Sequence, residues 1–312
     1  MKEVTPKAIV IHGGAGKVDM SDLEDSRNLH AKTLALKKIV QSGWDELSKN
    51  SSALDVATNT IVLLENDEPF NAGYGSSIGF DENGDPLVSL DASIMLQTDG
   101  MYKFGGVTGI MCMRNPILVA RAVLNQRANL LHGDGANALA REVAKQNLLP
   151  ISENRDLMTE YKLRKFEAYK EANTPESREG GTVGVVVFDG TTIVAATSTG
   201  GITGKAFGRT GDSCIPGAGT YADSYGGSSA TGFGESIMLQ GSAKKAVELL
   251  NEHYSPQEAA QIVTDELRDS FEGKGGIILV DKYGEIGIAT NTEHMPNAFM
   301  TDRMDAPVVK IN

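Results

Sequence analysis

The sequence predicts an α+β fold in which two mainly antiparallel sheets pack together and helices cover both outer faces, an αββα sandwich. Strand and helix patterns occur in two comparable sets, one on each side of Thr182. Short turns at 189–190 and 282–284 join pairs of predicted strands, which favours antiparallel hairpins. With 312 residues, the chain is long enough to bury a sizeable core.

The first set begins with an apolar run at 8–11, which predicts a buried strand leading into a glycine-rich loop. At the end of this strand, His12 is either a structural histidine or a residue that lines a site. Apolar residues at helical spacing predict helices over 21–48 and from 52 to about 65. The other elements predicted here are strands at 87–96 and 104–113 and helices starting at 115 and after 135.

The segment before Thr182 is highly charged, with 13 charged residues among the 28 from 152 to 179. Such a run predicts a surface helix near 157–172 that frays into a linker. The second set of elements follows it. We expect strands at 183–188, 192–197, 276–280 and 285–289 and helices at 235–250 and 256–271.

Charge and cysteine content restrict the classes of partner and compartment. The formal net charge of -12 argues against nucleic acid or an anionic membrane as the main partner, since both select for basic patches. The two cysteines, Cys112 and Cys214, have neither metal-ligand spacing nor a disulfide framework, so a reducing compartment is expected. Since no segment resembles a secretion signal or a membrane span, we expect a cytoplasmic protein that acts on a small molecule.

Thr182 lies where the charged segment ends and a buried strand begins, directly after Gly180 and Gly181. A threonine hydroxyl is a weak nucleophile unless a base lies beside it, and its own α-amine can be that base. Cleavage of the peptide bond after Gly181 would free this amine, whose pKa would be about 8. The alternative is that the Gly-Gly-Thr-Val-Gly string at 180–184 is only a turn followed by a strand.

A second candidate nucleophile is Ser77, since residues 75–79 match the G-x-S-x-G string of serine esterases. That string needs a strand before the serine and a helix after it. Here a glycine loop precedes Ser77 and the acidic turn 81–85 follows it. The context therefore argues against an esterase.

Several short motifs occur in an order that resembles the plant-type (type 2) L-asparaginase and isoaspartyl peptidase family of N-terminal nucleophile hydrolases. Each motif alone is weak, but the ordered set covers nearly the whole chain. The motifs are IVIHGGAG at 9–16, FNAG at 70–73, GGTVG at 180–184, ATSTGG at 196–201, GRTGDS at 208–213, IPGAGTYA at 215–222, SATGFGE at 229–235 and NTE at 291–293.

The resemblance implies one N-terminal nucleophile hydrolase domain that cuts itself between Gly181 and Thr182. The products would be an α chain, 1–181, with a flexible charged tail at about 152–181, and a β chain, 182–312. The freed Thr182 would then hydrolyse L-asparagine and β-aspartyl dipeptides through a β-aspartyl ester. Two such αβ units would form a homodimer.

The resemblance also assigns roles around the nucleophile. Thr199 matches a second threonine that hydrogen-bonds near the nucleophile and tunes it. Thr231 and the backbone N–H of Gly232 match the oxyanion hole, whose donors face the developing negative charge. Asn71 matches a residue near the scissile bond.

Arg209 and Asp212 match the pair that holds the α-carboxylate and α-ammonium of an aspartyl substrate, and Gly234 matches a further substrate-binding position. A guanidinium can grip a carboxylate with two parallel hydrogen bonds, and an aspartate can accept from an ammonium. The alternative is that Arg209 and Asp212 pair with each other on the surface.

No metal or cofactor is expected in catalysis. In relatives, the loop that aligns with 64–74 binds a structural sodium ion through backbone carbonyls. The corresponding residues here are Leu64, Glu65, Asp67, Phe70, Ala72 and Tyr74.

Some positions depart from the family pattern. Thr210 stands where the family usually has valine, and Cys214 stands where it usually has proline. Residues 206–207 and 224–227 also differ on loops expected to border the substrate, which leaves substrate preference open. Two other functions remain open: a glycosylasparaginase, which the 215–223 stretch also resembles, and a non-catalytic binding protein that never cuts itself.

Overall fold

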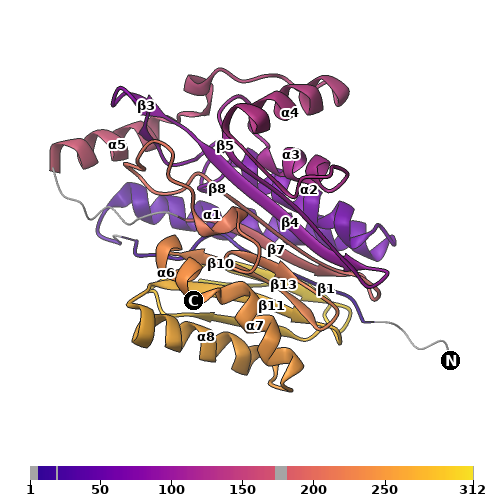
Figure 1. The fold of residues 1–312 in the computed structure, drawn as a ribbon. Coiled ribbons are helices and arrows are strands. Elements are labelled where there is room, and N and C mark those ends of the chain that lie inside the picture. The colour runs from indigo at the N-terminus through magenta and orange to yellow at the C-terminus, as the bar shows by residue number, and fades with distance from the viewer. Residues whose placement is uncertain (1–5, 19, 173–180, 312) are drawn as a thin grey trace.

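The computed structural model describes residues 6–18, 20–172 and 181–311, and its described strands form two main sheets (Figure 1). The larger sheet has the strand order β14-β13-β1-β7-β8-β4-β5-β6, and the smaller has β12-β11-β10-β9. The strands of the larger sheet are β1 (Ala8–His12), β4 (Leu90–Thr98), β5 (Met101–Ile110), β6 (Leu130–His132), β7 (Val183–Phe188), β8 (Ile193–Thr199), β13 (Asn297–Thr301) and β14 (Val308–Lys310). The smaller sheet comprises β9 (Thr220–Ala222), β10 (Gly226–Gly232), β11 (Gly275–Asp281) and β12 (Ile286–Thr290).

All the described pairings in these sheets are antiparallel except that of β5 with β6, which is parallel. A short separate hairpin pairs β2 (Gly79–Phe80) with β3 (Pro86–Leu87) around the predicted acidic turn. The larger sheet takes strands from both sides of Thr182, so the two sets of elements in the sequence do not correspond to the two sheets. The central strand β7 begins directly after Thr182, so the predicted nucleophile lies at the N-terminal end of a central strand and is buried.

The helices pack on the outer faces of the two sheets, as Figure 1 shows. Helices α1 (Leu23–Ser48), α2 (Ala53–Asn66), α3 (Pro116–Val123) and α4 (Gly133–Gln146) contact the larger sheet, and α6 (Gly234–Gln240), α7 (Ser242–Asn251) and α8 (Pro256–Phe271) lie with the smaller one. Strands β10 and β11 contact β7 of the larger sheet directly.

Alternation along the strands explains how one sheet builds two cores. On β1, Ile9 and Ile11 join the core beneath helices α1 and α2, whereas Ala8 and Val10 join the core between the sheets. The pattern follows from the two-residue period of a strand. Since both faces are covered, β1 and β7 are buried along their whole length and show continuous apolar runs.

The sequence predicted most helix ends correctly, because their capping residues are local. Asp22 caps α1 by accepting from two backbone N–H groups, and Ser52 caps α2. Helix α8 begins with a capping box between Ser255 and Glu258. The single helix predicted over 235–250 is wrong. Gly241, with a φ of +66°, ends α6 and separates it from α7.

The charged segment is helical where the structure describes it. A short 3-10 turn at Asn154–Leu157 precedes helix α5 (Glu160–Ala172). Phe166 of α5 is fully buried and packs on Phe80 with ring centroids 5.1 Å apart. The helix is therefore docked by an apolar anchor and is more than a solvated surface helix. The rest of the predicted flexible tail, at 173–180, lies outside the described residues.

Within the described part of the chain, no helix is long and apolar enough to cross a membrane.

Candidate active site

Strand register brings the two predicted threonines together. Strands β7 and β8 pair with Val183 opposite Ser198, so Thr182 and Thr199 lie at the same end of the pair. The hydroxyl of Thr182 donates to Thr199 Oγ1 at 3.2 Å, and both residues are buried. The predicted nucleophile is therefore held by the residue that the sequence assigned to tune it.

The carbonyl oxygen of Gly181 receives two side-chain hydrogen bonds. Asn71 Nδ2 donates to it at 2.5 Å, and Thr199 Oγ1 donates to it at 3.3 Å. Thr182, Thr199 and the carbonyl therefore form a chain of hydrogen bonds that runs from the hydroxyl to the carbonyl next to it. Donors on a carbonyl oxygen stabilise negative charge that develops there during attack.

Asn71 is fixed on all sides. Its amide group also donates to the Gly201 carbonyl at 2.7 Å, and its oxygen accepts from the backbone of Ser77 at 2.6 Å. The residue lies in the loop between α2 and β2 and is almost fully buried. These contacts hold the amide in one orientation, with its N–H toward the Gly181 carbonyl.

The loop after β1 lies against the predicted cleavage site. A Cβ on Gly14, which has a φ of +101°, would lie 2.7 Å from the Cα of Gly181. Only glycine allows both this backbone conformation and this approach. The next residue, Ala15, donates its N–H to Thr231 Oγ1 at 3.2 Å. One short loop thus connects the cleavage site to the predicted oxyanion hole.

Thr231 and Gly232 lie at the end of β10, in the smaller sheet. Gly232 has a φ of +140°, and a Cβ there would lie 2.3 Å from the carbonyl oxygen of Lys274. A side chain is therefore excluded, because the backbone of Lys274 lies directly against Gly232.

Asp212, one of the predicted substrate-binding residues, is buried at the start of the 3-10 turn Asp212–Cys214. Within the described residues, its Oδ2 has no hydrogen-bond partner. Burial raises the pKa of Asp212 to about 7, with Glu235 and Asp91 adding to the rise and Arg209 opposing it. A Cβ on Gly234 would lie 2.7 Å from Asp212 Oδ1, so this glycine leaves room beside the carboxylate.

Arg209 does not pair with Asp212 as the alternative interpretation required. It binds Glu235 with two hydrogen bonds, Nε to Oε1 at 2.8 Å and Nη2 to Oε2 at 3.0 Å. The same guanidinium lies within 3.3 Å of the point where a Cβ on Gly234 would stand. Sequence reasoning missed Glu235, although its place directly after Gly234 in the SATGFGE motif was a usable signal.

A buried polar network lies next to the anchors and was also missed. Lys205 and Asp91 are both buried, with Nζ 3.9 Å from Oδ2, and Lys205 donates to the carbonyl of Ser89 at 2.6 Å. The other oxygen of Asp91 accepts from Thr108 at 2.6 Å, and Thr108 Oγ1 lies 3.0 Å from Thr210 Oγ1. The hydroxyl of Thr210, where the family usually has valine, therefore extends this network.

His12 lies against the backbone of Thr182, and the N–H of Ser77 donates to Asn71 Oδ1. His12 is fully buried between the sheets, its Nε2 lies 3.0 Å from Ser229 Oγ, and burial lowers the pKa of the ring to about 3. Ser77 is buried as well, and it is followed by strand β2 where an esterase needs a helix. The esterase interpretation is therefore not supported.

Gly75 packs tightly in the loop proposed to hold sodium. The carbonyl oxygens of Glu68 and Phe70 lie 2.2 and 2.4 Å from the point where a Cβ on Gly75 would stand, so a side chain there would clash with the backbone. Of the predicted set, Leu64, Glu65 and Asp67 each already accept one backbone hydrogen bond, and a carbonyl has a second lone pair for a cation. In the described residues, no three His, Cys, Asp or Glu side chains form a metal-binding group.

Comparison with known proteins gives matches along nearly the whole chain. The family model described as "Asparaginase" matches residues 5–309. The chain is 38% identical to the plant-type L-asparaginase of Pyrococcus horikoshii, across 96% of this chain and 98% of that protein. It is 37% identical to the plant-type L-asparaginase of Thermococcus kodakarensis, with the same coverage. It is also 35% identical to the isoaspartyl peptidase/L-asparaginase of Mus musculus, across 92% of this chain and 86% of that protein.

Proposed function

The chain belongs to the asparaginase family, and we propose that it is a self-cleaving threonine amidohydrolase acting on L-asparagine and β-aspartyl dipeptides. One observation carries the proposal. The Gly181 carbonyl accepts hydrogen bonds from Asn71 and Thr199, and the Thr182 hydroxyl donates to the same Thr199. The names of the relatives favour this function over a glycosylasparaginase.

Self-cleavage follows from the hydrogen-bond chain. Thr182 Oγ1 bonds to the carbonyl carbon of Gly181, and Asn71 stabilises the negative charge that develops on the carbonyl oxygen. The proton of Thr182 Oγ1 passes through Thr199 to that oxygen. The C–N bond to Thr182 then breaks as the carbonyl forms again, and the same proton moves from the oxygen to the leaving nitrogen. Water hydrolyses the resulting ester, which leaves a carboxylate on Gly181 and a free α-amine on Thr182.

Turnover uses the new amine as the base. The α-amine takes the proton from Oγ1 as the oxygen bonds to the side-chain carbonyl carbon of asparagine. Thr231 and the N–H of Gly232 stabilise the oxyanion. The C–N bond breaks, the Thr182 ammonium returns the proton to the leaving amine, and water hydrolyses the β-aspartyl ester to L-aspartate.

The substrate backbone binds at the anchor residues. Arg209 grips the α-carboxylate, and the buried carboxylate of Asp212 accepts from the α-ammonium. The buried Oδ2 of Asp212, which has no hydrogen-bond partner among the described residues, and the absence of a side chain at Gly234 support this assignment. A buried carboxylate beside an arginine favours a zwitterionic amino-acid end over an uncharged amide.

The arrangement of helices and sheets supports a four-layer αββα sandwich of the N-terminal nucleophile hydrolase type. A sodium ion in the 64–74 loop, held by backbone carbonyls including that of Phe70, would stiffen the loop that carries Asn71. A homodimer of αβ units and a cytoplasmic location remain predictions, the second based on the free thiols of Cys112 and Cys214.

The deciding experiment is the intact mass of the purified protein under denaturing conditions, with Thr182→Ala as the comparison. We expect fragments that end at Gly181 and begin at Thr182 in the wild type, and a single uncut chain in Thr182→Ala. A Thr182→Ala variant that still cuts itself and still hydrolyses asparagine would rule out the proposed nucleophile. A wild-type chain that stays whole would favour a non-catalytic binding protein.

A further inference from the structure

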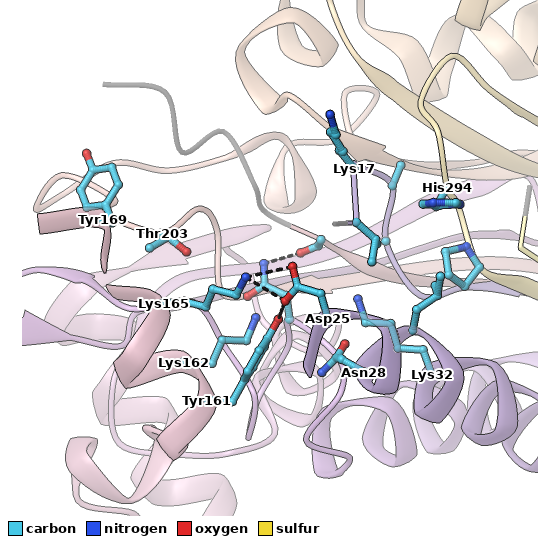
Figure 2. Close-up of a pocket in the computed structure, with 18 of the residues that line it drawn as sticks. Lys17, Asp25, Asn28, Lys32, Tyr161, Lys162, Lys165, Tyr169, Thr203 and His294 are labelled. Carbon is cyan, nitrogen blue, oxygen red and sulfur yellow. Dashed lines mark hydrogen bonds and ion pairs between the residues drawn. The ribbon is translucent and has the colours of Figure 1, made fainter. Parts of the chain in front are cut away.

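Arg209 lies on the loop 200–211, which follows strand β8. The first half of this loop is held by packing against helix α5. A side chain on Gly204 would overlap the ring of Tyr169, which lies on α5. Figure 2 shows Tyr169 beside Thr203, the residue before that glycine. The start of the loop is therefore fixed by contacts with apolar and aromatic groups.

The second half of the loop, which carries Arg209, is packed less closely. It lines a cavity of about 370 Å³, and residues 206–208 are exposed. The Phe207 side chain is 56% exposed, and a Cβ on Gly208 would have no neighbour within 4 Å in the described part of the chain. Packing therefore leaves this half of the loop room to move, so polar contacts have to set the position of Arg209.

Thr210 makes such a polar contact directly after Arg209. Its Oγ1 lies 3.0 Å from Oγ1 of Thr108 on strand β5, and Thr108 Oγ1 donates to Asp91 Oδ1 at 2.6 Å. Asp91 faces Lys205, so its carboxylate accepts and does not donate. Since the single hydroxyl proton of Thr108 is used on Asp91, Thr210 must be the donor to Thr108. The loop thus donates, through Thr108, to a buried charge.

Asp91 is a rigid acceptor for this chain of hydrogen bonds. It is fully buried, and its Oδ1 also accepts from the N–H of Gly109 at 3.1 Å. Strand register places Asp91 opposite Thr199, the residue that binds the nucleophile. The hydroxyl of Thr210 therefore sets the position of Arg209 relative to the strand that holds the nucleophile in place.

We propose that Thr210 is a positioning residue for Arg209 and that it acts through Thr108. The inference rests on the function proposed above, in which Arg209 binds the substrate α-carboxylate. The hydroxyl, which stands where the family usually has valine, holds the guanidinium in place before the substrate arrives. Such preorganisation lowers the cost of binding. It makes asparagine bind more tightly and leaves the chemical step unchanged.

The first test compares Thr210→Val and Thr210→Ser with the wild type, all as fully cleaved protein. Valine keeps the shape of threonine without its hydroxyl, whereas serine keeps the hydroxyl. Thr210→Val should raise KM for asparagine by about threefold to tenfold, the effect of one lost hydrogen bond, with kcat unchanged. Thr210→Ser should keep KM within about twofold of the wild type. The competitive inhibition constant of L-aspartate, which carries the same α-carboxylate, should rise with KM in Thr210→Val alone.

Thr264→Val is the matched control. Thr264 is a buried threonine of helix α8 whose hydroxyl donates to the Ala260 carbonyl of the same helix at 3.0 Å. The substitution removes a buried hydroxyl without touching the loop of Arg209. Both KM for asparagine and the inhibition constant of L-aspartate should stay at their wild-type values.

The second test places Thr210→Val in two other backgrounds. In Arg209→Ala, it should not lower kcat/KM for asparagine any further, because Thr210 acts only through Arg209. In Thr108→Val, it should likewise add nothing, because the partner hydroxyl is already gone. A change that merely loosened the structure would lower kcat/KM again in both backgrounds.

Three results would overturn the assignment while leaving the proposed function intact: a wild-type KM in Thr210→Val, a raised KM that Thr210→Ser does not restore, or a further loss in the Arg209→Ala background. Fragment masses are measured on every variant. If Thr210→Val failed to cut itself while Thr210→Ser cut normally, the hydroxyl would serve folding and the assignment would also fall. The proposed function fails in a different way, by the absence of asparagine hydrolysis in the wild type.

Discussion

Arg209 and Glu235 form a two-pronged ion pair, with Nε 2.8 Å from Oε1 and Nη2 3.0 Å from Oε2. Arg209 is mostly buried, with a side chain only 14% exposed. Glu235 therefore holds the guanidinium in place. If Arg209 binds the substrate carboxylate as proposed, Glu235 is a positioning residue that acts through Arg209.

Arg209→Ala should separate cleavage from turnover. We expect complete self-cleavage, because Arg209 makes none of the described contacts with the Gly181 carbonyl. Loss of one partner of a buried charge pair costs about 2–5 kcal/mol, so kcat/KM for asparagine should fall at least about 30-fold. Fragment masses and initial rates measure the two effects. Normal asparagine hydrolysis in this variant would show that the anchor is misassigned.

The pH dependence of kcat/KM should report Asp212. Burial raises the pKa of this carboxyl to about 7, and the substrate ammonium needs the ionised form. The value of kcat/KM should therefore fall as the pH drops below about 7, whereas kcat should persist to lower pH because a bound ammonium lowers the pKa of Asp212. For stability the sign is the reverse: the contribution of Asp212 is present at low pH and is lost as the pH rises through about 7.

Glu235→Gln provides the check on that assignment. It removes a negative neighbour that raises the pKa of Asp212. The acid limb of kcat/KM should therefore move to lower pH in this variant, with a higher KM for asparagine. Glu248→Gln, an exposed change on α7, is the control. If the acid limb of the kcat/KM profile is at the same pH in Glu235→Gln as in the wild type, the titrating group is not Asp212 but another group, such as the Thr182 α-amine.

Asn71→Ala should slow self-cleavage. Removing one donor to a developing oxyanion typically costs about 3–4 kcal/mol, which corresponds to a rate lower by about 100-fold to 1000-fold. The rate is measured as the growth of the 1–181 fragment by mass spectrometry. Asn59→Ala on α2, where the side chain binds only Glu46 among the described contacts, is the control. Cleavage at the wild-type rate in Asn71→Ala would mean that this amide does not stabilise the intermediate.

Phe166→Ala should undock or destabilise helix α5. Phe166 is fully buried against Phe80, and truncation of a buried phenylalanine costs about 3–5 kcal/mol. Urea unfolding of the uncut Thr182→Ala background gives the free energy of unfolding, and limited proteolysis within 160–172 detects local undocking. Phe207→Ala, at a side chain that is 56% exposed, should change little. Equal stability and equal proteolysis in both variants would contradict the anchor.

The sequence predicted elements best where the signal is local. The helices predicted to start at 21, 52 and 256 begin within two residues of those positions, each beside a local capping residue, and the short turn at 189–190 joins β7 to β8 as predicted. Strand β10 was missed as a strand, because glycine, serine, alanine and threonine at 226–232 give no apolar alternation. The break at Gly241 was missed too, because nothing in the local pattern of 235–250 separates a kinked helix from two helices.

The sequence alone determined the family, the nucleophile candidate Thr182 and the set of residues expected around it, because each is carried by a short motif. Only the tertiary structure decided how these motifs meet. Asn71 contacts Gly181, which is 110 positions away in the sequence. Arg209 binds Glu235, although Asp212 lies closer to it in the sequence. Thr210 meets Thr108 only because strand β5 and the loop after β8 line one cavity. Such contacts depend on strand register and packing, which no local stretch of sequence encodes.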